Sequence, residues 1–454
     1  MTAETHAYAQ TLGEEDSIWF KISPFVNSPD PMGILKRLCA KQGGCVPVNL
    51  RSERIFFLSE IDYIRHVLVD NVDNYAKYFD GLKPIFGNAM ITIDGVLWQK
   101  VRQPQQSYFH PNVYAGYLPH FMVAIRNKME AWGQLARSGE NKIEMLEQTW
   151  GLAADMVCRA LFDREVPFNP KAVFGAVKAY TDASEHRAIR MKKVSGELVE
   201  VTDAHAPANA IGAWLSLPEA VIAATPWQDR EKTLLKMMQA AENNPDMPAW
   251  NHQQVLDEIK QYLWAGTETT ALTLGWAFYL LSQHPEVAEK IRREGEEVYG
   301  DREPNADDLE KLTYTRSVVL ETLRLYPPAW AFIRSAVAED EIAGHEIKPG
   351  DRIVLLPYLV HHSEKYWDNP EEFRPERFEP GSVKKRVKYS YLPFGAGKRF
   401  CVGGQMAQME TAMALSQLVR RFRVEYAGSA PPQIAASVTL MPKGGLPFRI
   451  HELS

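Results

Sequence analysis

Apolar residues recur at helical spacing along most of the chain. The spacing predicts helices near residues 31–42 and 60–71, and long helical patterns fill much of residues 97–330, with breaks around 204–207 and 243–248. Another helix is predicted after Cys401. The most apolar run, Ala271–Leu281, is shorter than the roughly 18 residues of a membrane span and is typical of a buried helix.

Short apolar stretches near both ends of the chain predict strands instead. Residues 44–50 and 54–60 indicate two strands joined by a polar turn, residues 74–94 a loop, and residues 438–450 a hairpin. Turn signals between apolar stretches from Glu339 onward indicate further strands. The sequence therefore predicts a mainly α protein with small β-sheets (α+β). We expect one large helical domain with a small β-rich portion over residues 24–454, after a polar tail at 1–23.

Charge and cysteine content narrow the class of protein. The chain has 454 residues with 51 basic and 57 acidic side chains, and a net charge of 51 − 57 = −6 argues against nucleic-acid binding. Four cysteines without a CxxC pair argue against a disulfide framework or a zinc knuckle, so a reducing cytoplasm is expected. The polar N-terminus resembles no signal peptide, and no membrane anchor is expected.

The segment FGAGKRFCVGG surrounds Cys401 with a cation and several glycines. Arg399 and a helix that begins after Cys401 both favour a thiolate, and Gly395 and Gly397 allow a tight loop. Three interpretations compete: an inert buried cysteine, a nucleophile that needs a distant base, or the axial ligand of a haem iron. The third also uses Gly403, where a flat ligand could lie against the chain.

The segment AGTETT, Ala265 to Thr270, places polar groups within an apolar helix. A buried carboxyl at Glu268 is costly without a partner, and Gly266 lowers helix stability by about 1 kcal/mol relative to alanine. One interpretation is a threonine hydroxyl bonded to the preceding turn. The other is a proton relay through Glu268 and Thr269 beside a groove at Gly266.

Two further pairs carry weaker signals. Glu321 and Arg324 have the spacing of a solvated surface pair, but apolar neighbours favour burial, and Arg377 could join them. Trp98 and Arg102 share one helical face and could grip a carboxylate, although an exposed arginine on an amphipathic helix is the simpler interpretation.

Together and in this order, these motifs resemble the cytochrome P450 family of haem-thiolate monooxygenases, and a soluble bacterial-type member is expected. The resemblance covers about residues 24–450. The haem-loop pattern is met by Phe394, Gly397, Arg399, Cys401 and Gly403, and the oxygen-activation pattern by Ala265, Gly266, Glu268, Thr269 and Thr270. The Glu-x-x-Arg pattern is met by Glu321 and Arg324, with Arg377 as the third member of a structural triad.

The resemblance implies haem b as cofactor and O2 as co-substrate. It implies that Cys401 is the axial thiolate, which favours O–O cleavage. Catalytic roles fall to Thr269, which would hold the oxygen intermediate and its water, and to Glu268, which would feed protons. The implied haem-binding residues are Trp98, Arg102, Ala265, Arg334, Phe394, Arg399, Cys401 and Gly403.

The resemblance also implies an apolar substrate, such as a terpenoid, fatty acid or steroid. The implied pocket residues are Phe79, Leu82, Phe86, Leu263, Ala329, Trp330, Ala331, Phe332, Val438 and Thr439. Electrons would come from a ferredoxin or flavodoxin-type partner with an NAD(P)H reductase, and a monomer is expected. The basic run at Lys384–Lys388 and Lys398 either steers this partner or is simply a solvated charged face. A peroxide-driven peroxygenase and a non-catalytic haem sensor or electron carrier are the alternatives. The acid–threonine pair argues against both.

Overall fold

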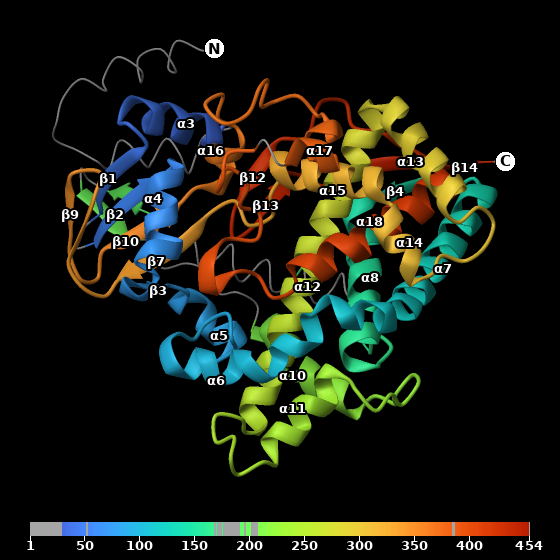
Figure 1. Ribbon diagram of the computed structural model, residues 1–454, viewed down its shortest axis with the longest axis horizontal. Helices are drawn as coiled ribbons and strands as arrows, with labels where there is room; N and C mark the ends of the chain where they lie inside the picture. Colours follow the sequence, from blue (N-terminus) through green and yellow to red (C-terminus); the bar gives the residue numbers. More distant parts are fainter. Residues whose placement is uncertain are drawn as a thin grey trace.

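The computed structural model describes residues 30–453 apart from 51–52, 168, 170–174, 176–190, 195–196, 201–207 and 384–385. Helices make up most of this part of the chain, and a group of strands lies toward one side of the molecule (Figure 1). The predicted class, mainly α with small β-sheets, is confirmed. The expected tail at 1–23 lies outside the described residues.

The helices follow the predicted segments closely. They are α3 (Pro31–Lys41), α4 (Ile61–Arg65), α5 (Lys83–Phe86), α6 (Gly95–Gln105), α7 (Tyr114–Ser138), α8 (Met145–Val157), α10 (Ala208–Ala223), α11 (Leu234–Glu242), α12 (His252–Gln283), α13 (Pro285–Val298), α14 (Ala306–Lys311), α15 (Thr313–Leu325), α16 (Pro357–His361), α17 (Pro380–Val383) and α18 (Gly404–Arg421). A π-helix, η1 (His66–Asp70), continues α4, and a 3-10 turn, η8 (Gly397–Arg399), precedes Cys401. No helix among the described residues is long and apolar enough to cross a membrane.

The long helix α12 organises the helical side of the molecule. Its 32 residues span about 48 Å at 1.5 Å per residue. The side chain of Asn251 caps its first turn by accepting a hydrogen bond from the N–H of Gln254. It packs against α8, α10, α15 and α18, and the run Ala271–Leu281 is buried except for Tyr279. The expectation of a buried helix there is confirmed.

The strands form several small sheets from distant parts of the chain. The largest has the order β1 (Cys45–Leu50), β2 (Glu53–Leu58), β10 (Arg352–Leu355), β7 (Phe332–Ala336) and β3 (Tyr75–Lys77). Smaller sheets join β11 (Phe422–Tyr426), β14 (Pro447–Glu452) and β4 (Lys142–Glu144), β12 (Ile434–Ala436) and β13 (Leu440–Pro442), β5 (Met191–Val194) and β6 (Glu197–Glu200), and β8 (Asp340–Ile342) and β9 (His345–Ile347). The prediction that strands come from both ends of the chain is confirmed.

Two local predictions were wrong. The tail at 438–450 is not a hairpin, because β13 pairs with β12 whereas β14 pairs with β11 and β4. β14 therefore pairs with strands from elsewhere in the chain instead of turning back on β13. The segment at 74–94 is not simply a loop, since it contains β3 and the short helix α5.

A buried ion pair fixes the segment that leads to Cys401. Arg324 and Glu321 are 0% exposed, and the guanidinium donates two hydrogen bonds of 2.8 Å to the two carboxylate oxygens. Arg377 lies 3.4 Å from the same carboxylate, and the N–H of Arg374 donates to it at 3.0 Å. The predicted triad is therefore brought together, and the surface interpretation of the Glu321–Arg324 pair is excluded.

We predict that Arg324→Met lowers the free energy of unfolding by about 3–5 kcal/mol, because the carboxylate of Glu321 would stay buried without its cation. Urea denaturation of the purified protein measures the loss. The matched control is Arg293→Met, which removes an exposed pair with Glu289 on α13 and should change nothing measurable. Equal losses in the two variants would show that burial of the ion pair is not what stabilises the protein.

Candidate functional site

Cys401 lies in a tight loop whose backbone is closed on itself. The N–H of Cys401 donates to the carbonyl oxygen of Phe394 at 3.0 Å, and the N–H of Gly395 donates to that of Leu392 at 3.1 Å. Gly397 has a φ of +67°, and a Cβ there would overlap the carbonyl oxygen of Leu68 in η1. Glycine at 397 therefore allows the loop to lie directly on η1.

Cys401 differs from the other three cysteines. Cys39, Cys45 and Cys158 are buried, whereas Cys401 is exposed to the cavity that it lines. Its position inside the protein raises the pKa of the thiol. Hydrogen bonds from the N–H groups of Gly403 and Gly404 and the charge of Arg102 act in the opposite direction. The expected helix N-terminus thus does favour a thiolate. The positive charge that favours it is that of Arg102, not that of Arg399 as the sequence predicted.

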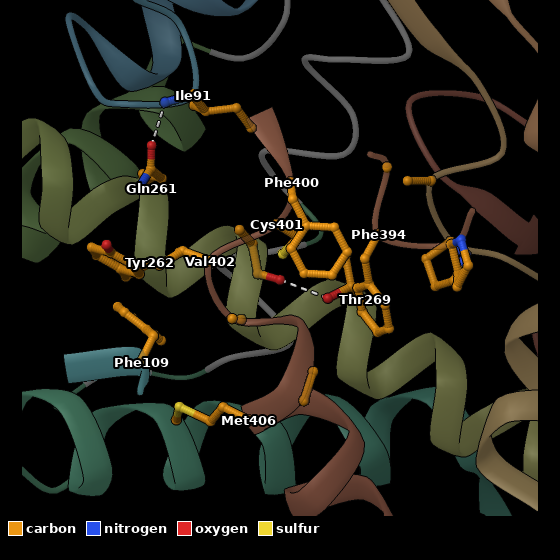
Figure 2. Close-up of a pocket in the computed structure, with 18 of the residues that line it drawn as sticks. Ile91, Phe109, Gln261, Tyr262, Thr269, Phe394, Phe400, Cys401, Val402 and Met406 are labelled. Carbon is orange, nitrogen blue, oxygen red and sulfur yellow. Dashed lines mark hydrogen bonds between the residues drawn. The ribbon is translucent and has the colours of Figure 1, made fainter. Parts of the chain in front are cut away.

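The cavity has a volume of about 310 Å³ and lies between two helical faces. On α12 the lining residues recur at 262, 265–266, 269–270 and 273, and after Cys401 they recur at 403, 406–407 and 410–411. This i, i+3/i+4 repeat places each set on one side of its helix. Figure 2 shows Thr269 and Cys401 pointing into this same cavity.

Thr269 makes the local bond that the simpler interpretation expects. Its hydroxyl donates to the carbonyl oxygen of Ala265 at 2.7 Å, so its oxygen keeps lone pairs free to accept from the cavity (Figure 2). Gly266 also lines the cavity, but a Cβ there would lie 2.8 Å from Cγ2 of Val157 on α8. Glycine at this position therefore lets α8 approach closely and also leaves space beside Thr269.

Glu268 points elsewhere. It is 3% exposed and does not belong to the cavity lining, and its Oε1 accepts a hydrogen bond of 3.0 Å from the hydroxyl of Thr439. As expected for neighbours on a helix, Glu268 and Thr269 face different surroundings.

Cations gather at one edge of the cavity around Trp98. Lys77, Arg102 and Arg399 lie over its ring at 5.3, 5.9 and 4.2 Å from the centroid. Arg399 is also ion-paired with Asp94, which caps α6. Burial, together with the neighbouring arginines, lowers the pKa of Lys77 to about 6. This edge of the cavity therefore brings several basic side chains together, with the carboxylate of Asp94 paired to Arg399.

This chain is similar to known proteins over most of its length. Its sequence matches the family model described as cytochrome P450 over residues 18–447. The chain belongs to the cytochrome P450 family. It is a cytochrome P450 monooxygenase, since the relatives include a monooxygenase by name.

Individual relatives agree with this assignment. The chain is 28% identical to Protein LUTEIN DEFICIENT 5, chloroplastic, of Arabidopsis thaliana over 92% of this chain and 73% of that protein. It is 28% identical to cyclooctatin synthase of Streptomyces melanosporofaciens over 87% of this chain and 85% of that protein. The crystal structure of the cytochrome P450DA heme domain superposes with a TM-score of 0.79 at 19% identity, covering 95% of this chain and 94% of that one. This last likeness shows the fold alone.

The residues at the cation edge fit a haem. The atoms Nε and Nη1 of Arg399 are buried, and within the described residues neither has a hydrogen-bond partner. Arg334 also lines the cavity, and burial lowers the pKa of its guanidinium to about 10. Buried cations without enough acceptors suit the two propionate groups of a haem. A Cβ at Gly403 would meet only Phe109, at 4.0 Å, so the space over Gly403 is open.

The predicted site residues divide into two sets. The cavity is lined by Phe79, Trp98, Arg102, Ala265, Thr269, Ala329, Phe332, Arg334, Phe394, Arg399, Cys401 and Gly403. Outside this lining lie Glu268, Leu82, Phe86, Leu263, Trp330, Ala331, Val438 and Thr439. Phe86 packs on Trp214 and Trp264 instead, and the indole N–H of Trp330 donates to the carbonyl oxygen of Ser437 at 2.7 Å.

Several lining residues were missed from the sequence. They include Lys77, Met90, Ile91, Phe109, Gln261, Tyr262 and Glu410. Gln261 and Tyr262 stand one turn before Ala265 and Gly266, so helical periodicity could have found them. Lys77 and Ile91 come from the segment at 74–94, where no periodic pattern reveals which side chains turn inward.

We predict that Cys401→His abolishes the absorption band of the reduced carbonmonoxy complex near the wavelength that gives the family its name, even where haem is retained. The imidazole would replace the thiolate that the loop places in the cavity. Cys39→Ala, Cys45→Ala and Cys158→Ala are the controls. Each of these thiols is buried outside the cavity lining, so none of them faces the space where a haem would bind. A normal band in Cys401→His would remove the assignment.

Proposed function

We propose that this monooxygenase inserts one oxygen atom of O2 into a C–H or C=C bond of an apolar small molecule, using haem b and electrons from a separate redox partner. The observation that carries the proposal is the cavity itself, in which the thiol of Cys401 and the hydroxyl of Thr269 share one apolar space. The cation edge supports it, because unpartnered guanidinium atoms are what an anionic cofactor would bind.

Four residues of this chain would hold the haem. Cys401 would ligate the iron, and Arg102, Arg334 and Arg399 would bind the propionates beside Trp98. Once bound, the haem supplies the activation of O2 and the transfer of oxygen. The chain's own residues would bind it, orient it and keep water in defined places around it.

Thr269 would hold a water molecule inside the cavity. Its hydrogen is engaged by the carbonyl oxygen of Ala265, so the hydroxyl oxygen acts as an acceptor toward that water. Glu268 would feed protons from behind α12, where the hydroxyl of Thr439 orients its carboxyl. The position of Thr439 thus favours a role beside Glu268 over the role of pocket wall expected from the sequence.

The cavity wall favours an apolar substrate such as a terpenoid, fatty acid or steroid. Phe79, Ile91, Ala329 and Phe332 line the cavity with side chains that have no hydrogen-bonding groups. Another relative is named cyclooctat-9-en-7-ol 5-monooxygenase, and that name describes the oxidation of an unsaturated alcohol. It is 28% identical over 87% of this chain.

We predict that Thr269→Ala keeps haem content and substrate-induced spin-state shifts close to wild type, while most reducing equivalents leave as hydrogen peroxide. Loss of the hydroxyl would remove the acceptor that holds the proton-delivering water, and positioned proton transfer typically contributes 10²–10⁴-fold. Peroxide and product yields per NADPH measure the effect. Glu268→Gln should instead slow the whole cycle. Tight coupling in Thr269→Ala would contradict the assignment.

A ferredoxin or flavodoxin-type partner would dock beside the cysteine loop. The loop contacts α6, because Arg102 in the last turn of that helix donates to the carbonyl oxygen of Phe400 at 3.3 Å. Val96, Leu97 and Phe400 are exposed apolar residues there, and Lys100 and Lys398 are exposed cations. Lys384 and Lys385 of the predicted basic run lie outside the described residues.

We predict that Lys100→Glu slows partner-driven reduction by about tenfold at low salt, because an acidic partner is steered by surface charge. The difference should shrink at high salt, since the Debye length is about 8 Å at physiological ionic strength. Stopped-flow reduction measures the rates, and dithionite reduction should be unchanged. Lys142→Glu, on β4, is the control. Equal salt dependence in the wild type and in Lys100→Glu would count against this docking surface.

A further inference from the structure

The segment at 87–92, between α5 and α6, is attached to α12 by hydrogen bonds to side chains. The N–H of Met90 donates to Oε1 of Glu258 at 2.6 Å, and the N–H of Ile91 donates to Oε1 of Gln261 (Figure 2). Glu258 and Gln261 are three residues apart and therefore share one face of α12. The segment forms neither a strand nor a helix, so these side chains satisfy its backbone donors. Met90 and Ile91 both line the cavity, so the bonds fix part of its wall.

Glu258 has donors on both of its oxygens, and its side chain is 0% exposed. Oε1 also accepts from the amide of Gln254 at 3.0 Å, and Oε2 accepts from the amides of Gln105 at 2.9 Å and Gln261 at 3.3 Å. All four donors are uncharged N–H groups. A carboxylate can accept all four bonds, whereas a protonated carboxyl would turn its O–H against one of these donors.

Gln105 connects the same carboxyl to α6 and to the cavity. Its side chain is 0% exposed, and its Oε1 accepts from the hydroxyl of Tyr262 at 2.6 Å. Tyr262 lines the cavity, whereas Glu258 does not. Glu258 therefore acts on a ligand only through other residues, since it holds the wall segment through Oε1 and α6 through Oε2.

We propose that ionised Glu258 is a positioning residue that sets where Met90 and Ile91 stand in the cavity wall, and thereby the affinity for long apolar ligands, a role that rests on the proposed function. The charged carboxyl holds the N–H of Met90 against α12. Loss of the charge releases that N–H, because the carboxyl then carries a hydrogen where a donor approaches. The wall loses its fixed place, and an apolar ligand loses contacts with the two side chains.

The affinity for such a ligand should depend on pH near neutrality. Burial raises the pKa of Glu258 to about 7, against its hydrogen bonds and the charge of Lys77 on β3. Tyr262 also faces the carboxyl, but burial raises the pKa of its hydroxyl, so it stays neutral. Gln105 and the segment at 87–92 carry no charge. Ionised Glu258 is the form that holds the wall, so the affinity should fall as the pH drops through about 7.

Two triazoles that ligate haem iron test the proposal on the ferric holoenzyme. 1,2,4-Triazole occupies only the space at the iron, whereas 1-hexyl-1,2,4-triazole extends an apolar chain toward the wall, and both are uncharged near neutral pH. At about pH 8, Glu258→Gln should weaken binding of the hexyl compound about tenfold in spectral titrations and leave 1,2,4-triazole unchanged. Equal weakening of both probes, or unchanged or tighter binding of the hexyl compound, would overturn the proposal.

The pH dependence separates this role from a merely structural one. The wild type should bind the hexyl compound more weakly at about pH 6 than at about pH 8, relative to 1,2,4-triazole. Glu258→Asp keeps a carboxyl and should retain this dependence. Glu258→Gln should be equally weak at both pH values, because its amide N–H group permanently faces the donors. An affinity ratio that does not change with pH in the wild type would also overturn the proposal.

The matched control is Asp308→Asn, which alters another fully buried carboxyl, on α14, outside the cavity lining. Asp308 accepts from the N–H of Asn305 at 2.9 Å, so this variant also disturbs a buried bond to the backbone. Its affinity ratio should match that of the wild type, and a ratio equal to that of Glu258→Gln would count against the proposal. Failure of the proposed function would instead appear in the wild type, as a missing carbonmonoxy band.

Discussion

The guanidinium of Arg324 is the group on which the geometry of the site depends. All five of its N–H bonds donate, two to the Glu321 carboxylate and three to the carbonyl oxygens of His361, Pro370 and Glu372. Two of these acceptors, the carbonyl oxygens of Pro370 and Glu372, lie in a stretch with little regular structure after α16. The side chain therefore satisfies backbone groups that a helix or sheet would otherwise satisfy, and it fixes where that stretch runs.

His361 connects Arg324 to the segment that leads to Cys401. Its Nδ1–H donates to the carbonyl oxygen of Arg324 at 3.1 Å, and its Nε2 accepts from the N–H of Leu392 at 2.8 Å. Burial holds the pKa of His361 well below its ordinary value, so a neutral ring can donate on one side and accept on the other. Leu392 stands two residues before Phe394, whose carbonyl oxygen accepts from Cys401. A buried ion pair thus positions a sulfur some eighty residues later in the chain.

How much of this could be predicted from the sequence depends on how far apart along the chain the interacting residues lie. The cysteine loop and the faces of α6 and α12 were predictable, because Trp98 with Arg102, and Ala265 with Thr269, are related by helical spacing. The pairing of β14 with β4 was not predictable, since those strands lie some three hundred residues apart. Lys77 was missed for the same reason. Only β3, paired with β7 in the largest sheet, brings it to the edge where Arg334 and Arg399 lie.

Three consecutive residues of α12 show why the sequence motif alone could not reveal that Glu410 lines the cavity. Successive helical positions turn by about 100°, so Glu268 is turned away from the cavity that Thr269 and Thr270 both line. Glu268 meets Thr439 of the C-terminal segment, Thr269 opens on the cavity, and Thr270 meets Glu410 on α18. The acid beside Thr269 in sequence is thus turned away from the cavity, whereas an acid some 140 residues later faces it. Glu268 and Thr269 are neighbours in the chain but face different surroundings. The packing of α18 against α12 instead brings Thr270 and Glu410 together.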